Sequence, residues 1–198
     1  MTTKKELRTR YKQMRAAIPA ERAGELSLAL AQIAIRDPVF LSARIVHLFL
    51  PIRRLHEVDT YPLLDEVFRS GRTAVVSVSD FSSGRMAHYR LRAGDPLIEN
   101  AYGIPEPADV GSLPPVRPQE IDLVFVPLLA YDAQGARVGY GRGFYDRFLR
   151  QCSARTVRAG LSFFPSEPEP IADLSPDDVP IDCCFTPQGK ITCPPRDV

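Results

Sequence analysis

Residues 121–149 read IDLVFVPLLAYDAQGARVGYGRGFYDRFL, and this stretch decides the fold class. Its first seven residues, 121–127, are mostly valine, leucine, isoleucine and phenylalanine, which is typical of a buried strand. The residues from about Phe144 to Cys152 predict an amphipathic helix. Glycine-rich residues separate the two, so the stretch predicts a strand, a loop and a helix in succession. Such a unit belongs to an open α/β sheet, in which ligands bind outside the carboxyl ends of the strands.

The rest of the chain repeats this alternation. Further strands are expected at 44–50, 73–78, 86–91, 156–162 and 181–186, and further helices at 3–18, from about 20 toward 37, and at 60–70. Residues 93–120 are rich in proline and glycine and are expected to form a long surface excursion. The alternation predicts a three-layer α/β fold, a mostly parallel sheet flanked by helices, with an N-terminal helical segment. We expect a single domain that spans 1–198.

The expected N-terminal helix has an apolar and a basic stripe. The apolar stripe is predicted to contain Leu7, Tyr11, Met14 and Ile18, and the basic stripe Lys4, Arg8, Lys12 and Arg15. A basic stripe of this kind is usually a solvated helix face. Lys4 and Arg8 are four residues apart, so both side chains lie on the same face and can reach one ligand.

The composition limits the classes of partner. Lys and Arg number 25 against 24 Asp and Glu, and the net charge of +1 gives no overall field that attracts nucleic acid or membranes. The longest apolar run, 123–130, is too short to span a bilayer. The four cysteines lack a zinc-binding spacing and are expected to be free thiols, as in a reducing compartment. We therefore expect a cytoplasmic monomer that binds small molecules, without nucleic-acid or membrane partners.

The loop that precedes Phe144 has three alternating glycines. Gly139, Gly141 and Gly143 allow backbone conformations closed to other residues and a close approach to a ligand. The helix that follows presents its N-terminal amides to the same place, which predicts an anion site. The alternation G-x-G-x-G alone is weak support, because a glycine-rich turn has the same pattern.

Charged side chains around these glycines favour a nucleotide. Arg137 and Arg142 can make bidentate contacts with phosphates. Asp146 would repel a bare phosphate, but it suits a magnesium ion bound beside one. These residues together favour a magnesium–nucleotide site. The alternative is that Asp146 only complements the dipole of the helix.

These residues lie in a stretch, 122–149, that resembles the signature of the 5-formyltetrahydrofolate cyclo-ligases, also called 5,10-methenyltetrahydrofolate synthetases. That family typically reads D-L-V-x-V-P-G-L-A-F-D-x-x-G-x-R-L-G-Y-G-G-G-Y-Y-D-R-F-L. The resemblance continues in Lys4 and Arg8, in Glu57–Thr60 (EVDT), in Gly103–Pro107 (GIPEP) and in Asp178–Asp182 (DVPID). It implies an enzyme that uses ATP and Mg²⁺ to convert 5-formyltetrahydrofolate into 5,10-methenyltetrahydrofolate, with release of ADP and phosphate.

The resemblance also implies a role for individual residues. The implied ATP contacts are Lys4, Arg8, Arg137, Val138, Gly139, Tyr140, Gly141, Arg142, Gly143, Phe144 and Tyr145. The implied folate contacts are Leu50, Glu57, Tyr140, Gly141, Arg142, Gly143 and Phe144. The implied metal ligands are Asp146 and Asp178, and the implied catalytic residues are Arg137 and Arg142. In the implied mechanism the formyl oxygen attacks the γ-phosphate, and N10 of the folate then closes the ring as phosphate leaves.

The chain departs from the family pattern at several places. Arg142 stands at the middle glycine of the loop, Phe144 at the first of two tyrosines, and Phe163–Ser166 where a glutamine is common. The segment 51–56 is about two residues longer than usual before Glu57. Most of these changes fall where recognition of the substrate is decided, so they leave the nucleotide site intact.

Two other functions are compatible with the sequence. One is a non-catalytic or regulatory protein that binds a folate or a nucleotide, and the other is a kinase or ligase that acts on a different small acid. The metal carboxylate at Asp146 argues against the first, because a binding module needs none. His47, His56 and His88 are expected to be structural or exposed, since none of them pairs with a serine that a motif singles out.

Overall fold

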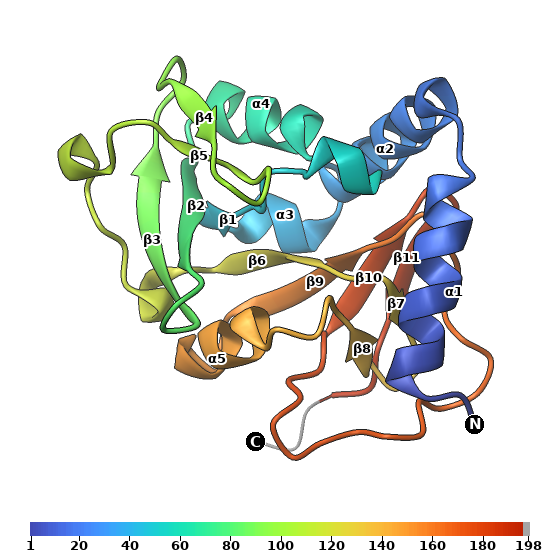
Figure 1. Ribbon diagram of the computed structural model, residues 1–198. Helices are drawn as coiled ribbons and strands as arrows, with labels where there is room; N and C mark the ends of the chain where they lie inside the picture. The colour runs from blue at the N-terminus through green and yellow to red at the C-terminus, as the bar shows by residue number, and fades with distance from the viewer. Residues whose placement is uncertain (196–198) are drawn as a thin grey trace.

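A seven-stranded sheet forms the centre of the molecule (Figure 1). The computed structural model describes residues 1–195. The strands, in the order β11-β10-β9-β6-β1-β2-β3, are Ile45–His47 (β1), Thr73–Asp80 (β2), Arg85–Leu91 (β3), Leu123–Pro127 (β6), Val157–Leu161 (β9), Cys183–Thr186 (β10) and Gly189–Thr192 (β11). Only the edge strands β3 and β11 pair antiparallel with their neighbours. The mostly parallel sheet predicted from the sequence is confirmed.

Strand β6 lies in the middle of the sheet. Its residues 123–126 are fully buried, because layers of side chains cover both faces. The strand begins at Leu123 and not at the expected residue 121, since Asp122 turns its carboxylate to the backbone. Asp122 Oδ2 accepts hydrogen bonds from the amides of Arg44 at 2.8 Å and Ile45 at 2.9 Å.

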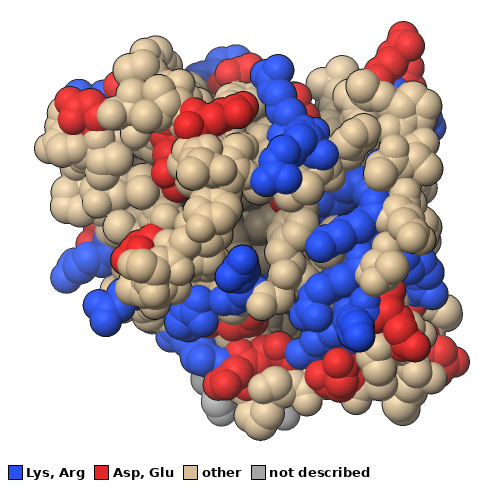
Figure 2. All heavy atoms as spheres, viewed as in Figure 1, with Lys and Arg blue, Asp and Glu red and all other residues tan. Residues whose placement is uncertain are grey.

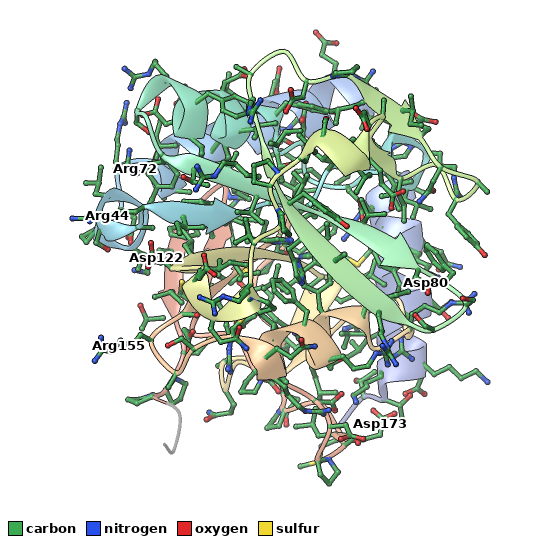
Figure 3. All side chains as sticks on the ribbon, turned by 90° about the vertical axis from the view of Figure 1, so that its left-hand side faces the viewer. Arg44, Arg72, Asp80, Asp122, Arg155 and Asp173 are labelled. Atoms are coloured by element: carbon green, nitrogen blue, oxygen red, sulfur yellow. The ribbon has the colours of Figure 1, made fainter. Side chains whose placement is uncertain are left out.

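The two edges of the sheet have different roles. Arg44, Arg72, Asp122 and Arg155, which precede four parallel strands, lie together on one side of the molecule in Figure 3. Asp80, at the end of β2, lies on the opposite side. That opposite side is the carboxyl edge of the parallel strands, where ligands are expected in this fold class.

Helices cover both faces of the sheet (Figure 1). The five α-helices among residues 1–195 are Lys4–Ala16 (α1), Ala20–Ala34 (α2), Pro38–Ser42 (α3), Tyr61–Arg69 (α4) and Phe144–Gln151 (α5). α2, α3 and α4 build one core with the sheet, which contains Leu30, Phe40 and Leu63. α5 builds the core on the other face through Phe148 and Leu149. The three-layer α/β architecture is thus confirmed.

Helix α1 packs against the small hairpin β7–β8. A capping box between Thr3 and Glu6 starts the helix. Leu7 and Tyr11 are buried against this hairpin, as predicted. Met14 was expected beside them but is 40% exposed, and Arg15 takes the buried position in that turn instead.

Several short elements escaped the sequence patterns. They are the hairpin strands Leu97–Glu99 (β4) and Pro105–Pro107 (β5), the hairpin strands Ala130–Tyr131 (β7) and Arg137–Val138 (β8), and the 3₁₀ turns Arg53–Leu55, Val110–Ser112 and Pro118–Glu120. Strands of two or three residues have no measurable periodicity, so only pairing partners reveal them. The four cysteines are free thiols, as expected. Within residues 1–195 no helix has the length and apolarity that crossing a membrane requires.

Candidate functional site

A cavity of about 310 Å³ opens at the carboxyl ends of β1, β2 and β6. Its walls come from α1, the β1–α4 connection, the β8–α5 loop and the turns of hairpins β2–β3 and β4–β5. Figure 2 shows the hollow in the middle of this face, with lysine and arginine side chains around it. Of the residues that the resemblance implied, those that line the cavity are Lys4, Arg8, Leu50, Glu57, Arg137, Gly139, Tyr140, Gly141, Arg142, Gly143, Phe144, Tyr145, Asp146 and Asp178. Val138 does not line it, because its side chain is buried in the core beneath α1.

Two of the three glycines are required by the shape of the loop. Gly141 and Gly143 have φ angles of 87° and 67°, which residues with a side chain rarely adopt. A Cβ atom on Gly143 would lie 2.9 Å from the Arg147 side chain, and one on Gly141 would lie 3.4 Å from the Arg8 guanidinium. Gly139 has no such φ angle. The expectation that all three glycines serve the backbone conformation is therefore wrong for Gly139.

Arg137 and Asp146 form a largely buried ion pair beneath the loop. Arg137 Nη2 donates to Asp146 Oδ1 at 2.6 Å, and Arg137 Nε donates to the Val179 carbonyl at 3.0 Å. The Val179 amide in turn donates to Asp146 Oδ1 at 3.1 Å. Burial lowers the pKa of Arg137, and the nearby carboxylate of Asp146 opposes this shift. The pair therefore fixes β8, α5 and the chain at Val179 to one another.

Helix α1 contributes two cations to the cavity. Lys4 forms an ion pair with Asp178, whose Oδ2 also accepts a hydrogen bond from the Ser175 amide at 2.7 Å. Burial acts to raise the pKa of Asp178, but Lys4 and the Ser175 amide outweigh it, so the pKa lies below its ordinary value. Arg8 Nε donates to the Gly139 carbonyl at 2.9 Å. Both cations therefore contact the site instead of forming a solvated face.

Glu57 is a recessed acceptor in the wall of the cavity. The Ile52 amide donates to its Oε2 at 2.7 Å, and the Tyr140 hydroxyl donates to its Oε1 at 2.6 Å. Burial raises the pKa of Glu57 above its ordinary value, although these hydrogen bonds act in the opposite direction. Burial also raises the pKa of Tyr140, so its hydroxyl keeps its proton and remains a donor.

Arg15 belongs to the site although no motif singled it out. Its Nη1 donates to the Tyr140 hydroxyl at 2.8 Å, and its Nη2 donates to the Leu128 carbonyl at 2.5 Å. The residue is only 5% exposed, so the expectation of a solvated stripe is wrong for Arg15. The spacing of Arg15 from Lys4 and Arg8 could have indicated that it belongs to the site, because the three residues share one side of the helix.

Aromatic side chains from two hairpin turns and from the start of α5 meet at the edge of the cavity. Phe81 stacks on Tyr102 with ring centroids 3.7 Å apart, and it meets Phe144 edge-on at 5.1 Å. Arg147 ties the loops together, since it donates to a carbonyl in the β2–β3 turn at 2.8 Å and to the Arg142 carbonyl at 2.9 Å. The Arg142 side chain is exposed at this edge.

Two histidines share a serine in the wall of the cavity. His47 Nε2 lies 2.7 Å from Ser77 Oγ, and His88 Nδ1 lies 2.8 Å from the same atom. Both histidines are buried, and Ser77 lines the cavity. Ser77 is not a serine that a motif singled out, so its contact with both histidines was not expected from the sequence.

Known proteins resemble this chain over most of its length. The 5-formyltetrahydrofolate cyclo-ligase of Escherichia coli (strain K12) is 32% identical over 141 residues, which are 70% of this chain and 75% of the relative. The mitochondrial 5-formyltetrahydrofolate cyclo-ligase of Arabidopsis thaliana is 30% identical over 190 residues, or 85% of this chain and 68% of the relative.

The resemblance extends to the fold. The solved structure of the 5,10-methenyltetrahydrofolate synthetase of Aquifex aeolicus superposes with a TM-score of 0.79 at 28% identity, and it covers 98% of this chain and 95% of that chain. The profile of the 5-formyltetrahydrofolate cyclo-ligase family matches residues 1–186. Sequence, fold and the residues gathered in the cavity thus agree, and the chain belongs to the 5-formyltetrahydrofolate cyclo-ligase family.

Proposed function

We propose that this chain uses ATP to close a ring in 5-formyltetrahydrofolate, which gives 5,10-methenyltetrahydrofolate, ADP and phosphate. One observation carries the proposal: a single cavity joins a glycine-rich loop and the cations Arg8 and Arg137 to the recessed carboxylate of Glu57. The loop and the cations suit a polyphosphate. The carboxylate suits a heterocycle that has N–H donors. Membership of the family supports ATP and a reduced folate as the two ligands.

We assign the phosphates of ATP to the loop at 139–143 and the start of α5. The first amides of α5 have no partner inside the helix, and the positive end of its dipole lies there. Arg137 is a fixed charge, because Asp146 and the Val179 carbonyl hold its guanidinium. Its remaining nitrogen, Nη1, lies 3.7 Å from the position of a Cβ atom on Gly139, on the side of the loop. Arg142 supplies a second, exposed charge at the edge of the cavity.

We assign the folate ring to the wall that contains Leu50 and Glu57. Leu50 is buried to 6% exposure and offers an apolar contact. Both oxygens of Glu57 already accept hydrogen bonds, from the Ile52 amide and the Tyr140 hydroxyl. A ring N–H of the substrate therefore takes the place of the Tyr140 hydroxyl or shares Oε1 with it. Exchange of one donor for another changes the free energy little.

The reaction needs positioning and neutralisation of charge, but no nucleophile from the protein. The formyl oxygen attacks the γ-phosphorus while the bond from that phosphorus to the ADP oxygen breaks. N10 then attacks the formyl carbon, the bond from that carbon to the phosphate oxygen breaks, and N10 loses its proton. Arg137 and Arg142 stabilise the charge that develops first on ADP and then on the departing phosphate.

The donor groups around the cavity fit Mg²⁺. This ion usually keeps waters and binds one or two carboxylates together with substrate phosphates. Asp146 uses only Oδ1, and Asp178 only Oδ2, for hydrogen bonds within the described chain, which leaves one oxygen of each carboxylate for a cation. Residues 1–195 contain no cluster of three or more histidine, cysteine, aspartate or glutamate side chains that would hold a metal without the substrate. When bound, the ion would neutralise part of the phosphate charge.

The proposal is tested with the purified chain, ATP, Mg²⁺ and 5-formyltetrahydrofolate. We expect the near-ultraviolet absorbance of the methenyl product to rise only when ATP is present, with one ADP formed per product. Absence of this signal from folded protein, while a known cyclo-ligase gives it in the same assay, would overturn the proposed function. Formation of ADP with another small acid, and none with the folate, would favour a kinase or ligase instead.

A further inference from the structure

Three adjacent strands bring a serine between two histidines at the inner wall of the cavity. His47 comes from β1, Ser77 from β2 and His88 from β3. Ser77 lies directly opposite His88 in the antiparallel pair of β2 and β3. The Ser77 hydroxyl lies 2.7 Å from His47 Nε2 and 2.8 Å from His88 Nδ1. The reaction steps proposed above use none of these three residues.

The burial of the histidines decides how they are protonated. Burial lowers the pKa of His47 well below 6.5 and that of His88 to about 4, so both rings are neutral near pH 7. His47 is fully buried, and its Nδ1 has no hydrogen-bond partner within residues 1–195. An orphaned buried N–H is rarer in proteins than an unsatisfied acceptor. We therefore place the proton of His47 on Nε2, from which it is donated to Ser77.

The Ser77 hydroxyl keeps one hydrogen-bonding position for a ligand. A hydroxyl group has one donor and two acceptor positions. His47 takes one acceptor position, and His88 takes either the donor position or the second acceptor position. The remaining position is left for the cavity that Ser77 lines. Ser77 donates to the ligand when the proton of His88 is on Nδ1, and it accepts from the ligand when that proton is on Nε2.

Ser77 lies on the side of the cavity that we assign to the folate. His47 pairs with Val75, and the Leu48 amide donates to the Val75 carbonyl at 2.9 Å, so the chain leaves β1 beside β2. Phe49, the next residue, lines the cavity together with Ser77. Phe49 leads directly into the connection that contains Glu57. Met86, on the neighbouring strand β3, also lines the cavity, so the hydroxyl is a polar group on a largely apolar part of the wall.

We propose that Ser77 is a specificity-determining contact for the folate ring system, and that His47 and His88 are positioning residues that orient its hydroxyl. The group that it recognises is a ring carbonyl oxygen or a ring N–H. This inference rests on the proposed function. It adds a polar contact to the substrate that is independent of the glycine-rich loop.

Three variants of the full-length chain test the inference. Ser77→Ala is expected to raise the KM and the Kd for 5-formyltetrahydrofolate about tenfold, which is the loss of one hydrogen bond, and to leave the KM for ATP unchanged. His88→Phe is expected to act in the same way. His88→Asn is expected to retain most of the affinity, because the Asn amide can replace the ring nitrogen that contacts Ser77. The KM values come from initial rates, and the Kd comes from isothermal titration without ATP.

Ser162→Ala is the matched control. Ser162 is also buried, and its hydroxyl accepts from the Phe164 amide at 3.0 Å, but it does not line the cavity. This variant is expected to keep both KM values. If Ser77→Ala does not fold, Ser77→Cys provides the same comparison, because a thiol has a similar size and is a weak hydrogen-bonding group.

The outcomes separate this inference from the proposed function. An unchanged KM and Kd for the folate in folded Ser77→Ala would overturn the role of Ser77. Equal increases in both KM values, or a raised folate KM in Ser162→Ala, would also overturn it, because the effect would then be structural. If the wild-type protein binds the folate but does not convert it, the proposed activity is overturned. The Kd values of the variants would still decide the role of Ser77. Wild-type protein that binds no folate would overturn both.

Discussion

The carboxylate of Asp146 faces a buried arginine with Oδ1, and we propose that Oδ2 binds a cation. Replacement by asparagine preserves its shape but removes the charge opposite Arg137, whose side chain is only 4% exposed. We expect Asp146→Asn to lower the free energy of unfolding by about 2 kcal/mol, because the arginine is left without its counterion. We also expect it to raise the Mg²⁺ concentration needed for half-maximal turnover. Urea unfolding and a Mg²⁺ titration of initial rates measure these two effects.

Asp177→Asn is the control for this substitution. Asp177 pairs with Arg150 at the surface, where its side chain is 83% exposed, so its loss is expected to cost less than about 1 kcal/mol. It is expected to leave the Mg²⁺ dependence unchanged. A destabilised Asp146→Asn enzyme with the wild-type Mg²⁺ dependence would make Asp146 a structural partner of Arg137, and Asp178 would then be the leading metal ligand.

Glu57 is expected to affect one substrate and not the other. Glu57→Gln removes a charged acceptor from a recessed position, so the KM for 5-formyltetrahydrofolate is expected to rise by about 10- to 100-fold, corresponding to ~1.5–3 kcal/mol. The KM for ATP is expected to stay the same. Because burial raises the pKa of Glu57, binding of the folate by the wild type should weaken as the pH falls through that raised value, and binding by Glu57→Gln should not. Equal increases in the KM values for ATP and for the folate would assign Glu57 a structural role.

At the scale of one element, we propose that α1 serves both substrates through different turns. Arg8 contacts the glycine-rich loop and Arg15 contacts Tyr140, the partner of Glu57. We expect Arg8→Ala to raise the KM for ATP by about tenfold with little loss of stability. We expect Arg15→Ala to raise the KM for the folate instead and to lower the free energy of unfolding by ~2 kcal/mol, since it leaves buried acceptors unpaired.

Lys5→Ala provides the control on the same helix, because Lys5 is exposed and does not line the cavity. It is expected to change neither KM. If Arg8→Ala and Arg15→Ala changed both KM values by the same factor, α1 would act only by holding the loop in place. A comparison of the two KM values across the three variants therefore decides whether the α1 side chains contact the substrates or only hold the loop in place.

The elements that the sequence predicted are those with their own hydrophobic pattern. The strand at 121–127 and the helix from Phe144 were expected within one or two residues of where they lie, because a buried strand and an amphipathic helix differ in periodicity. β7 and β8 were missed, since two residues show no period. Their hairpin exists because the Asp132 carboxylate accepts hydrogen bonds from two amides in its turn, and because α1 covers it. β11 was missed for the related reason that its residues are only partly buried.

At the scale of the whole molecule, the buried histidines make stability depend on pH. His88 has a pKa of about 4 in the folded chain, against about 6.5 when unfolded, and burial lowers the pKa of His47 as well. The free energy of unfolding that depends on these two neutral histidines is therefore fully present above pH 6.5. It is lost as the pH falls, because the unfolded chain binds protons that the folded chain excludes. For His88 alone we expect a loss of about 2 kcal/mol between pH 7 and pH 5. Urea unfolding at several pH values measures this slope.

His88→Asn should flatten that pH dependence, since it removes one of the two titrating groups. His56→Asn is the control, because His56 is only partly buried and its φ of 49° is one that asparagine tolerates. The slope should persist in this control. A slope that is the same in wild type and His88→Asn would show that other groups determine the pH dependence.

The single domain and the monomeric state remain predictions from the sequence. One sheet connects both hydrophobic cores, so we expect the chain to unfold in one transition and to elute as a 22.0 kDa monomer. Size-exclusion chromatography with light scattering, and unfolding followed by two spectroscopic probes, check both points. Two transitions that do not coincide would divide the chain into separate folding units.

The sequence by itself determined the α/β class and the glycine-rich loop, and nearly all of the residues that it singled out line the cavity. The class and the loop follow from local properties, namely the hydrophobic period of strands and helices and the residue types around one loop. The further site residues were implied by the resemblance to the cyclo-ligases. Only the tertiary structure decided which distant side chains meet. Arg15 reaches Tyr140 across 125 positions of the chain, and Ser77 joins histidines that lie 30 and 11 positions away. No spacing in the sequence encodes such contacts, because they depend on how α1 and the strands pack, and burial then fixes the protonation of the groups that meet.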